Sequence, residues 1–178
     1  MAILHIPATG ETLRDQTRVT SYLKERGIWF ELWEADVAFA SNASEEEILG
    51  AYQSSLKPFM AKGGYAVADV INVHQRTPNL HALRANFLRE HTHVEDEIRF
   101  FVDGEILFWF NTGEYVFSVK CSRGELLGIP AHMKHWSDLG ERPFIKAIRI
   151  FKDKSGWVPY YTESGVDEQY NPQYHVAD

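Results

Sequence analysis

The sequence predicts a mainly β fold, an antiparallel barrel or jelly roll, with helices packed on one side. Aromatic residues make up 13% of the 178 residues, and aromatic side chains favour strands. Between residues 90 and 151 short apolar runs alternate with turn residues, as in antiparallel sheets. Helix-start signals occur only in the first half of the chain. Since no linker or repeat divides the sequence, we expect one α+β domain spanning residues 1–178.

Residues 1–89 are expected to supply helices and outer strands. The segment 12–26 has partial helical spacing of apolar side chains and is followed by a glycine. Ser44 and Glu47 form a capping box, which opens a helix that reaches about residue 62 unless Pro58 ends or kinks it earlier. Thr77 followed by a proline opens a third helix, which ends near residue 89. The strands expected beside these helices are residues 2–6, 28–33 and 65–74.

Residues 90–158 are expected to form the core of the barrel. Asp103-Gly104 is the first of several turn signals that separate its strands. The expected strands are residues 91–102, 105–110, 115–121, 125–129 and 144–151. The polar segment 162–178 has no apolar periodicity, so we expect a mobile or loosely packed tail.

Composition argues against several classes of function. A net charge of −7 without a basic run gives a poor surface for nucleic acid or anionic membranes. The longest apolar run, residues 106–110, is far shorter than the ~20 residues of a membrane span. The single cysteine, Cys121, cannot form an internal disulfide, and we interpret it as a packing residue. No signal-peptide pattern is visible, so we expect a cytoplasmic protein with no nucleic-acid or membrane partner.

Histidines give the strongest indication of a functional site. His91 and His93 lie two residues apart, so on a strand both imidazoles point to one face. Glu97 has the same parity and also faces inward if the strand stays regular or turns once and resumes. His135 follows the 125–129 run and is placed to supply a fourth donor from a neighbouring strand. The alternative is a solvated histidine pair on an exposed strand.

Three imidazoles and one carboxylate suit Fe, Ni, Co, Cu or Zn better than Ca or Mg, which prefer all-oxygen ligands. On an octahedral metal these four donors leave two adjacent positions open. Two open positions accommodate a bidentate substrate, which is the arrangement of an oxygen-activating or Lewis-acid site.

The spacing of these residues resembles the two motifs of the cupin superfamily. The first motif corresponds to His91, His93 and Glu97, with a glycine at position 104, and the second to a glycine at position 124, Pro130 and His135. The segment 87–102 further resembles the acireductone dioxygenases. The same resemblance extends to residues 129–131 with 135–136, and to residues 147–149 with 156–158.

The resemblance to acireductone dioxygenases implies a methionine-salvage enzyme. It implies one Fe²⁺ or Ni²⁺ per chain and an enediol substrate that reacts with O2. We expect a monomer. The metal ligands it implies are His91, His93, Glu97 and His135. The chain departs from the family pattern at His132, where the family has a small residue or Asn, and at Ser137, where it has Phe. His132 is either a competing ligand or a loop residue beside the site.

Further residues near the implied site have two interpretations each. Arg99 shares the parity of Glu97, so it is expected to face the same cavity and to pair with the oxygens of the substrate dianion. Its alternative role is a structural salt bridge to a neighbouring acid, Glu95 or Asp96. Phe87 and Trp157 resemble the aromatic residues that line the family's pocket, and the alternative is that they are ordinary core residues.

Glu90 and Asp96 flank the implied ligands. Metal-binding imidazoles usually donate their second N–H to a carboxylate or a carbonyl, so both acids are candidates to orient the histidines. Solvation at the surface is the alternative. Two other functions remain open at this level: a different cupin oxygenase or isomerase with the same four ligands, and a non-catalytic cupin that senses a metal or ligand.

Overall fold

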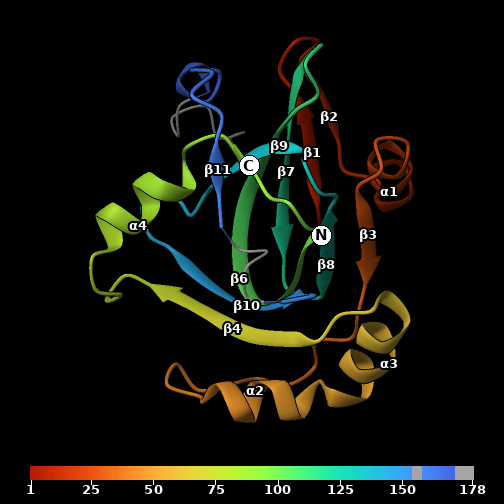
Figure 1. Cartoon of the computed structure of the whole chain (residues 1–178), viewed down its shortest axis with the longest axis vertical. Helices are drawn as coiled ribbons and strands as arrows, with labels where there is room; N and C mark the ends of the chain where they lie inside the picture. Colours follow the sequence, from red (N-terminus) through yellow and green to blue (C-terminus); the bar gives the residue numbers. More distant parts are fainter. Residues whose placement is uncertain (154–157, 171–178) are drawn as a thin grey trace.

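One long strand, β6 (Glu97–Asn111), organises the sheet of the computed structural model, which describes residues 1–153 and 158–170. An 11-stranded sheet runs in the order β11-β5-β9-β6-β7-β1-β2, while β8 and β10 also pair with β6, β3 pairs with β8, and β4 pairs with β10. All these pairings are antiparallel, and the sheet curls into a barrel-like jelly roll (Figure 1). The other strands are β1 (Ile3–Ile6), β2 (Glu11–Leu13), β3 (Trp29–Leu32), β4 (Val67–His74), β5 (His91–Thr92), β7 (Val116–Ser122), β8 (Glu125–Ile129), β9 (Lys134–Asp138), β10 (Phe144–Phe151) and β11 (Tyr160–Tyr161).

A β-bulge in β6 replaces the turn expected at Asp103-Gly104. The register against β10 shifts beside Lys146, which pairs with Asp103. Gly104 has φ 76°, and a Cβ there would lie 1.8 Å from the carbonyl oxygen of Phe144. The extra residue of a bulge reverses which side chains face inward. Odd-numbered residues of β6 therefore face the interior before the bulge and even-numbered residues face it afterwards.

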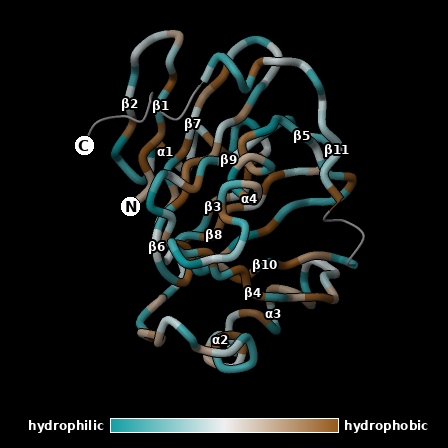
Figure 2. Tube along the Cα trace, turned by 90° about the vertical axis from the view of Figure 1, so that its left-hand side faces the viewer, coloured by the Kyte–Doolittle hydropathy of each residue, from teal (hydrophilic) through white to brown (hydrophobic). Residues whose placement is uncertain are grey.

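The hydrophobic residues form three clusters around this strand. The barrel interior holds side chains from both halves of β6, such as Phe101 and Phe108. A second cluster, which includes Phe100, lies between the sheet and the helices α2 (Glu45–Ala51) and α3 (Gln53–Gly63). Figures 1 and 2 show both helices beneath β4 and β10. A third cluster, centred on Trp109 and Trp136, covers the outer face of β6 and β9.

The expected helix over residues 44–62 is two helices. Ser44 caps α2 by accepting from the backbone N–H of Glu47 at 3.1 Å, as the capping box predicts. The break falls at Tyr52, whose side chain is buried in the second cluster, and not at Pro58. Pro58 is exposed and lies inside α3, which continues to Gly63. Burial of Tyr52 thus sets the helix boundary.

The other two helices are shorter than the sequence predicts. α1 (Gln16–Lys24) begins after Asp15, whose side chain accepts from the N–H of Arg18, because the preceding residues pair with β1 as strand β2. α4 (Leu80–Phe87) begins after Asn79. The Thr77 hydroxyl accepts from the N–H of His74 at 2.9 Å, so it ends β4 and does not cap the helix. Figure 1 shows α1 and α4 on opposite sides of the barrel.

The expectation of a loosely packed tail is wrong for residues 162–170, while residues 171–178 lie outside the described part of the chain. β11 pairs with β5, and a 3-10 turn, η2 (Asp167–Gln169), follows it. Val166 and Tyr170 pack against the third cluster. Hydrogen bonds from Thr162 and Ser164 tie this segment to Glu90. Within residues 1–153 and 158–170, no helix is long and apolar enough to cross a membrane.

Candidate metal centre

Three strands bring four buried donors together inside the barrel. His91 on β5 pairs in register with His135 on β9, and β6 begins at Glu97 after a bend that follows His93. One donor atom from each of these residues lies within 4.8 Å of the others. Their exposed fractions are only 2–7%. The sequence-predicted set is thus assembled as the strand alternation suggests, with one turn between His93 and Glu97.

The Glu97 carboxylate contacts two of the three histidines, His93 and His135. Its Oε2 lies 3.0 Å from Nε2 of His93 and 3.1 Å from Nε2 of His135. The ring of His91 completes the group, with its centroid 4.5 Å from that of His135. The Nε2 atoms of two histidines therefore converge on a single carboxylate oxygen.

Backbone carbonyls hold the opposite nitrogens of the imidazoles. Nδ1 lies 2.7 Å from the Arg89 oxygen in His91, 3.2 Å from the Val158 oxygen in His93 and 2.8 Å from the Met133 oxygen in His135. A carbonyl only accepts, so each Nδ1 carries the proton and donates it, which leaves Nε2 as the metal-binding nitrogen. Burial, followed by the charge of nearby His135, lowers the pKa of His91 to about 4. Near neutral pH this imidazole is neutral and able to bind a metal.

Arg99 lies two residues after Glu97 on β6 and pairs with it. Its Nε lies 2.6 Å from Oε1 of Glu97, and both side chains are buried. Burial alone would raise the pKa of Glu97, but the Arg99 guanidinium, followed by the close contacts with His135 and His93, holds it well below its usual range. The structural partner of Arg99 is therefore Glu97, and not Glu95 or Asp96 as the alternative interpretation proposed.

The donor set fits a borderline divalent metal. Three imidazole nitrogens and one carboxylate oxygen converge in a buried space, and this composition suits Fe²⁺, Ni²⁺ or Zn²⁺ more than Ca²⁺ or Mg²⁺. Each imidazole is oriented by a carbonyl on its far side, as ligand histidines usually are. The site is therefore preorganised for a cation.

The two acids expected to orient the histidines lie elsewhere. Glu90 accepts from Asn111 at 2.7 Å and from Ser164 at 2.5 Å, as well as from Thr162. Burial raises the pKa of Glu90, but these hydrogen bonds outweigh it and lower the pKa overall. Glu90 thus ties the segment after β11 to the strand that carries the first two histidines.

Asp96 accepts from the backbone N–H of Ala131 at 3.0 Å and hydrogen-bonds the Tyr65 side chain. Asp96 therefore fixes the position of the loop between β8 and β9. Backbone carbonyls, and not these two acids, orient the histidines. The sequence could not predict this, because every residue has a backbone carbonyl.

Phe87 lies beside Arg99, whose Cζ is 5.6 Å from the centre of its ring. Phe108 flanks the same guanidinium at 5.5 Å. The sequence analysis missed Phe108 because the bulge between Phe101 and Asp103 changes the inward parity of β6. Trp157, the other expected pocket aromatic, lies outside the described residues.

The two departures from the family pattern have different surroundings. His132 is exposed and lies outside the four-donor cluster, with φ 66° and its N–H bonded to the His93 oxygen at 2.8 Å. Its backbone N–H therefore holds the His93 carbonyl in place, and its side chain is not a competing metal donor. Ser137 is buried and pairs in register with Phe108 on β6, so the two side chains lie on the same face of the sheet.

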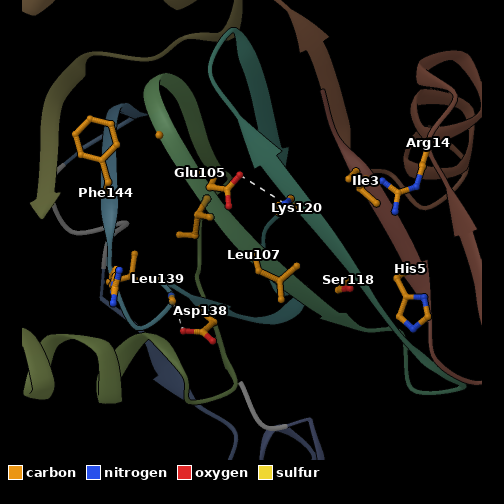
Figure 3. A pocket seen from close by; sticks show the side chains of 14 residues that line it. Ile3, His5, Arg14, Glu105, Leu107, Ser118, Lys120, Asp138, Leu139 and Phe144 are labelled. Atoms are coloured by element: carbon orange, nitrogen blue, oxygen red, sulfur yellow. Dashed lines mark hydrogen bonds and ion pairs between the residues drawn. The ribbon is translucent and has the colours of Figure 1, made fainter. Parts of the chain in front are cut away.

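A separate groove of about 460 Å³ lies on the outer face of the sheet (Figure 3). Its floor includes Leu107 and Ser118, and Arg14, Lys120 and Asp138 lie among its walls. None of the four donors lines it. The four donors therefore belong to the barrel interior and not to this groove.

Comparisons with known proteins agree with this geometry. A model of the ARD/ARD′ family matches residues 10–159. An acireductone dioxygenase of Picosynechococcus sp. is 49% identical over 171 residues, which cover 96% of this chain and 97% of the relative. One from Methylococcus capsulatus is 41% identical over 160 residues, which cover 90% of this chain and 86% of the relative.

A solved structure extends the likeness to three dimensions. It is the acireductone dioxygenase from Bacillus anthracis with a cadmium ion in its active centre, and it matches with a TM-score of 0.83 and 31% identity. The match covers 90% of this chain and 98% of that one. By sequence, by fold and by its buried cluster of three histidines and one glutamate, this chain belongs to the ARD/ARD′ family of acireductone dioxygenases.

Proposed function

We propose that the protein is a metal-dependent acireductone dioxygenase of methionine salvage. Its substrate is 1,2-dihydroxy-3-keto-5-methylthiopentene, which is cleaved with O2. With Fe²⁺ the products are 4-methylthio-2-oxobutanoate and formate. With Ni²⁺ they are methylthiopropionate, formate and carbon monoxide. In both cases the atoms of the enediol and of one O2 are fully accounted for by the products.

The observation that carries this proposal is the convergence of four buried donors in one preorganised cluster. His91, His93, Glu97 and His135 would hold one Fe²⁺ or Ni²⁺ per chain. When bound, the metal supplies Lewis acidity toward the oxygens of the enediol. Because three histidines and one glutamate accommodate either ion, the ligand set alone does not decide the products.

The polypeptide contributes charge and shape. Arg99 keeps Glu97 ionised at neutral pH and places a permanent positive charge beside the donors. That charge favours loss of the second proton of the enediol and stabilises the resulting dianion. Phe87, against the Arg99 guanidinium, forms an apolar wall suited to the methylthio tail of the substrate. The buried surroundings exclude bulk water from these contacts.

The test compares metal-free protein with protein loaded anaerobically with Fe²⁺ or Ni²⁺. Both loaded forms should consume O2 in the presence of the enediol, and the metal-free form should not. Formate should appear with both ions, and carbon monoxide should appear in the headspace only with Ni²⁺. Lack of O2 uptake by both loaded forms would refute the proposed activity, and equal carbon monoxide from both would refute control of the products by the metal.

A further inference from the structure

Helix α4 carries Phe87 at its last position, yet it is only loosely embedded in the protein. None of its residues is fully buried. Leu80, Leu83 and Phe87 are half-buried and pack against the interior cluster of the barrel. A wall of a binding pocket needs a defined position to discriminate between substrates. Apolar contacts of this kind do not by themselves fix the position of the helix.

A bidentate ion pair between Arg84 and Asp138 restrains the position of α4. Nε of Arg84 lies 3.0 Å from Oδ1 of Asp138, and its Nη2 lies 3.4 Å from Oδ2. The Asp138 side chain is 1% exposed and that of Arg84 is 24% exposed. Asp138 is itself held by the backbone N–H of Gly140 at 2.9 Å. A guanidinium that meets a carboxylate through two parallel contacts fixes orientation as well as distance.

The position of this pair in the chain connects it to the site. Arg84 precedes Phe87 by three residues, so the two side chains lie on the same face of the helix. Asp138 ends β9, three residues after His135. Figure 3 shows Asp138 at the lower end of the outer groove, on the strand whose other face contributes the His135 donor. The ion pair thus joins the helix that carries Phe87 to the strand that carries a metal donor.

We propose that Arg84 is a positioning residue for substrate specificity. Through Asp138 it fixes α4 so that the Phe87 ring stays beside Arg99 and contacts the apolar tail of the acireductone. Arg84 does not touch the reacting atoms. The inference rests on the proposed function, which places Phe87 in the substrate pocket.

The test measures discrimination between acireductones that differ in their tails. Arg84→Met keeps the length of the side chain and a good helix former, but removes the ion pair. We expect the KM for the methylthio substrate to rise about tenfold while kcat changes less than about twofold, since a hydrophobic contact is typically worth 10–200-fold. The preference over an acireductone with a short alkyl tail should fall by a similar factor. Arg84→Lys, which keeps the charge without the planar fork, should lie between wild type and Arg84→Met.

A matched control and a double-mutant cycle separate this role from general stabilisation. Arg18→Met removes another helical arginine from an exposed ion pair with Glu11 and should leave the discrimination unchanged. If Arg84 acts through Phe87, then Arg84→Met should add little to the loss of discrimination already caused by Phe87→Ala. Full additivity of the two effects would overturn the proposal.

A second measurement does not depend on turnover. A fluorinated phenylalanine at position 87 should give one sharp fluorine NMR signal in metal-loaded wild type, and a shifted or broadened signal in Arg84→Met and, less so, in Arg84→Lys. An unchanged signal together with unchanged tail discrimination would reduce the ion pair to a stabilising contact. If wild type itself turns over no acireductone, the proposed function fails first, and the NMR signal still decides whether Arg84 positions Phe87.

Discussion

The buried pair between Arg99 and Glu97 makes a quantitative prediction about stability. Replacing Arg99 with Met removes the cation but keeps most of the apolar volume of the side chain. The carboxylate of Glu97 is then left in the interior without the guanidinium that lies 2.6 Å away in the wild type. The loss of folding stability is best measured on metal-free protein, because a bound divalent ion would itself neutralise the carboxylate.

The magnitude follows from the burial of both partners. Their side chains are 4% and 3% exposed, so solvent screening does not reduce the interaction. Removing one partner of a buried ion pair typically costs about 3–5 kcal/mol. For a protein of this size each kcal/mol lowers the melting temperature by ~2–4 °C. We therefore expect metal-free Arg99→Met to melt about 10 °C below the wild type.

The effect should depend on pH in a defined direction. In the wild type the pKa of Glu97 lies well below its usual value, so its contribution to stability is present above about pH 4.5 and is lost only at lower pH. Without Arg99 the same burial raises the pKa of Glu97 relative to the wild type. Protonation then removes the uncompensated charge, so the difference in stability between the two proteins should shrink as the pH falls.

Urea unfolding of the chelator-treated proteins at several pH values measures both effects. Arg18→Met serves as the control, since the Arg18–Glu11 pair is exposed and a surface pair contributes less than about 1 kcal/mol. A loss in Arg99→Met no larger than that in Arg18→Met would show that the buried pair does not stabilise the fold. A stability difference independent of pH would show that Glu97 is not the group left uncompensated.

Two further predictions follow from the site and from the bulge. Ni²⁺ loading of metal-free protein, measured by equilibrium dialysis, should be complete at pH 8 and lost once the pH falls below about 4, because His91 binds a metal only as the neutral imidazole and its pKa is lowered to about 4. Full loading at pH 3 would contradict this. Gly104→Ala should lower the free energy of unfolding by about 2 kcal/mol or more, since its Cβ would meet the Phe144 oxygen at 1.8 Å with φ 76°. Gly113→Ala, also at positive φ but in open space, should cost less, and equal losses would show that close approach at the bulge is unimportant.

Strand alternation predicted that His91, His93 and Glu97 share one face, and chain position suggested His135 as the fourth donor. His91 and His93 share a face because of the two-residue period, and Glu97 rejoins that face after one bend. The family resemblance then assigned all four as metal ligands. These predictions succeeded because they depend on local geometry and spacing.

Features set by contacts distant in sequence were not predictable. An Asp-Gly pair occurs both in hairpin turns and next to bulges, and here the pairing of β6 with β10 continues the strand through residues 103–104. Strand β9 lacks apolar alternation because it carries a lysine, a histidine, a serine and an aspartate. Its burial depends on pairing with β6 and on the Arg84–Asp138 ion pair. Order in the segment after β11 likewise depends on hydrogen bonds to Glu90.

The central claim is that His91, His93, Glu97 and His135 together hold the metal at which the acireductone reacts. X-ray absorption spectroscopy of the Ni²⁺-loaded protein tests it most directly, with His135→Ala and His132→Ala as a matched pair of variants. The wild type and His132→Ala should show three imidazoles and additional oxygen ligands, with one Ni²⁺ per chain. His135→Ala should lose one imidazole or most of its metal. An unchanged nickel spectrum and metal content in His135→Ala, or loss of an imidazole in His132→Ala, would contradict the account.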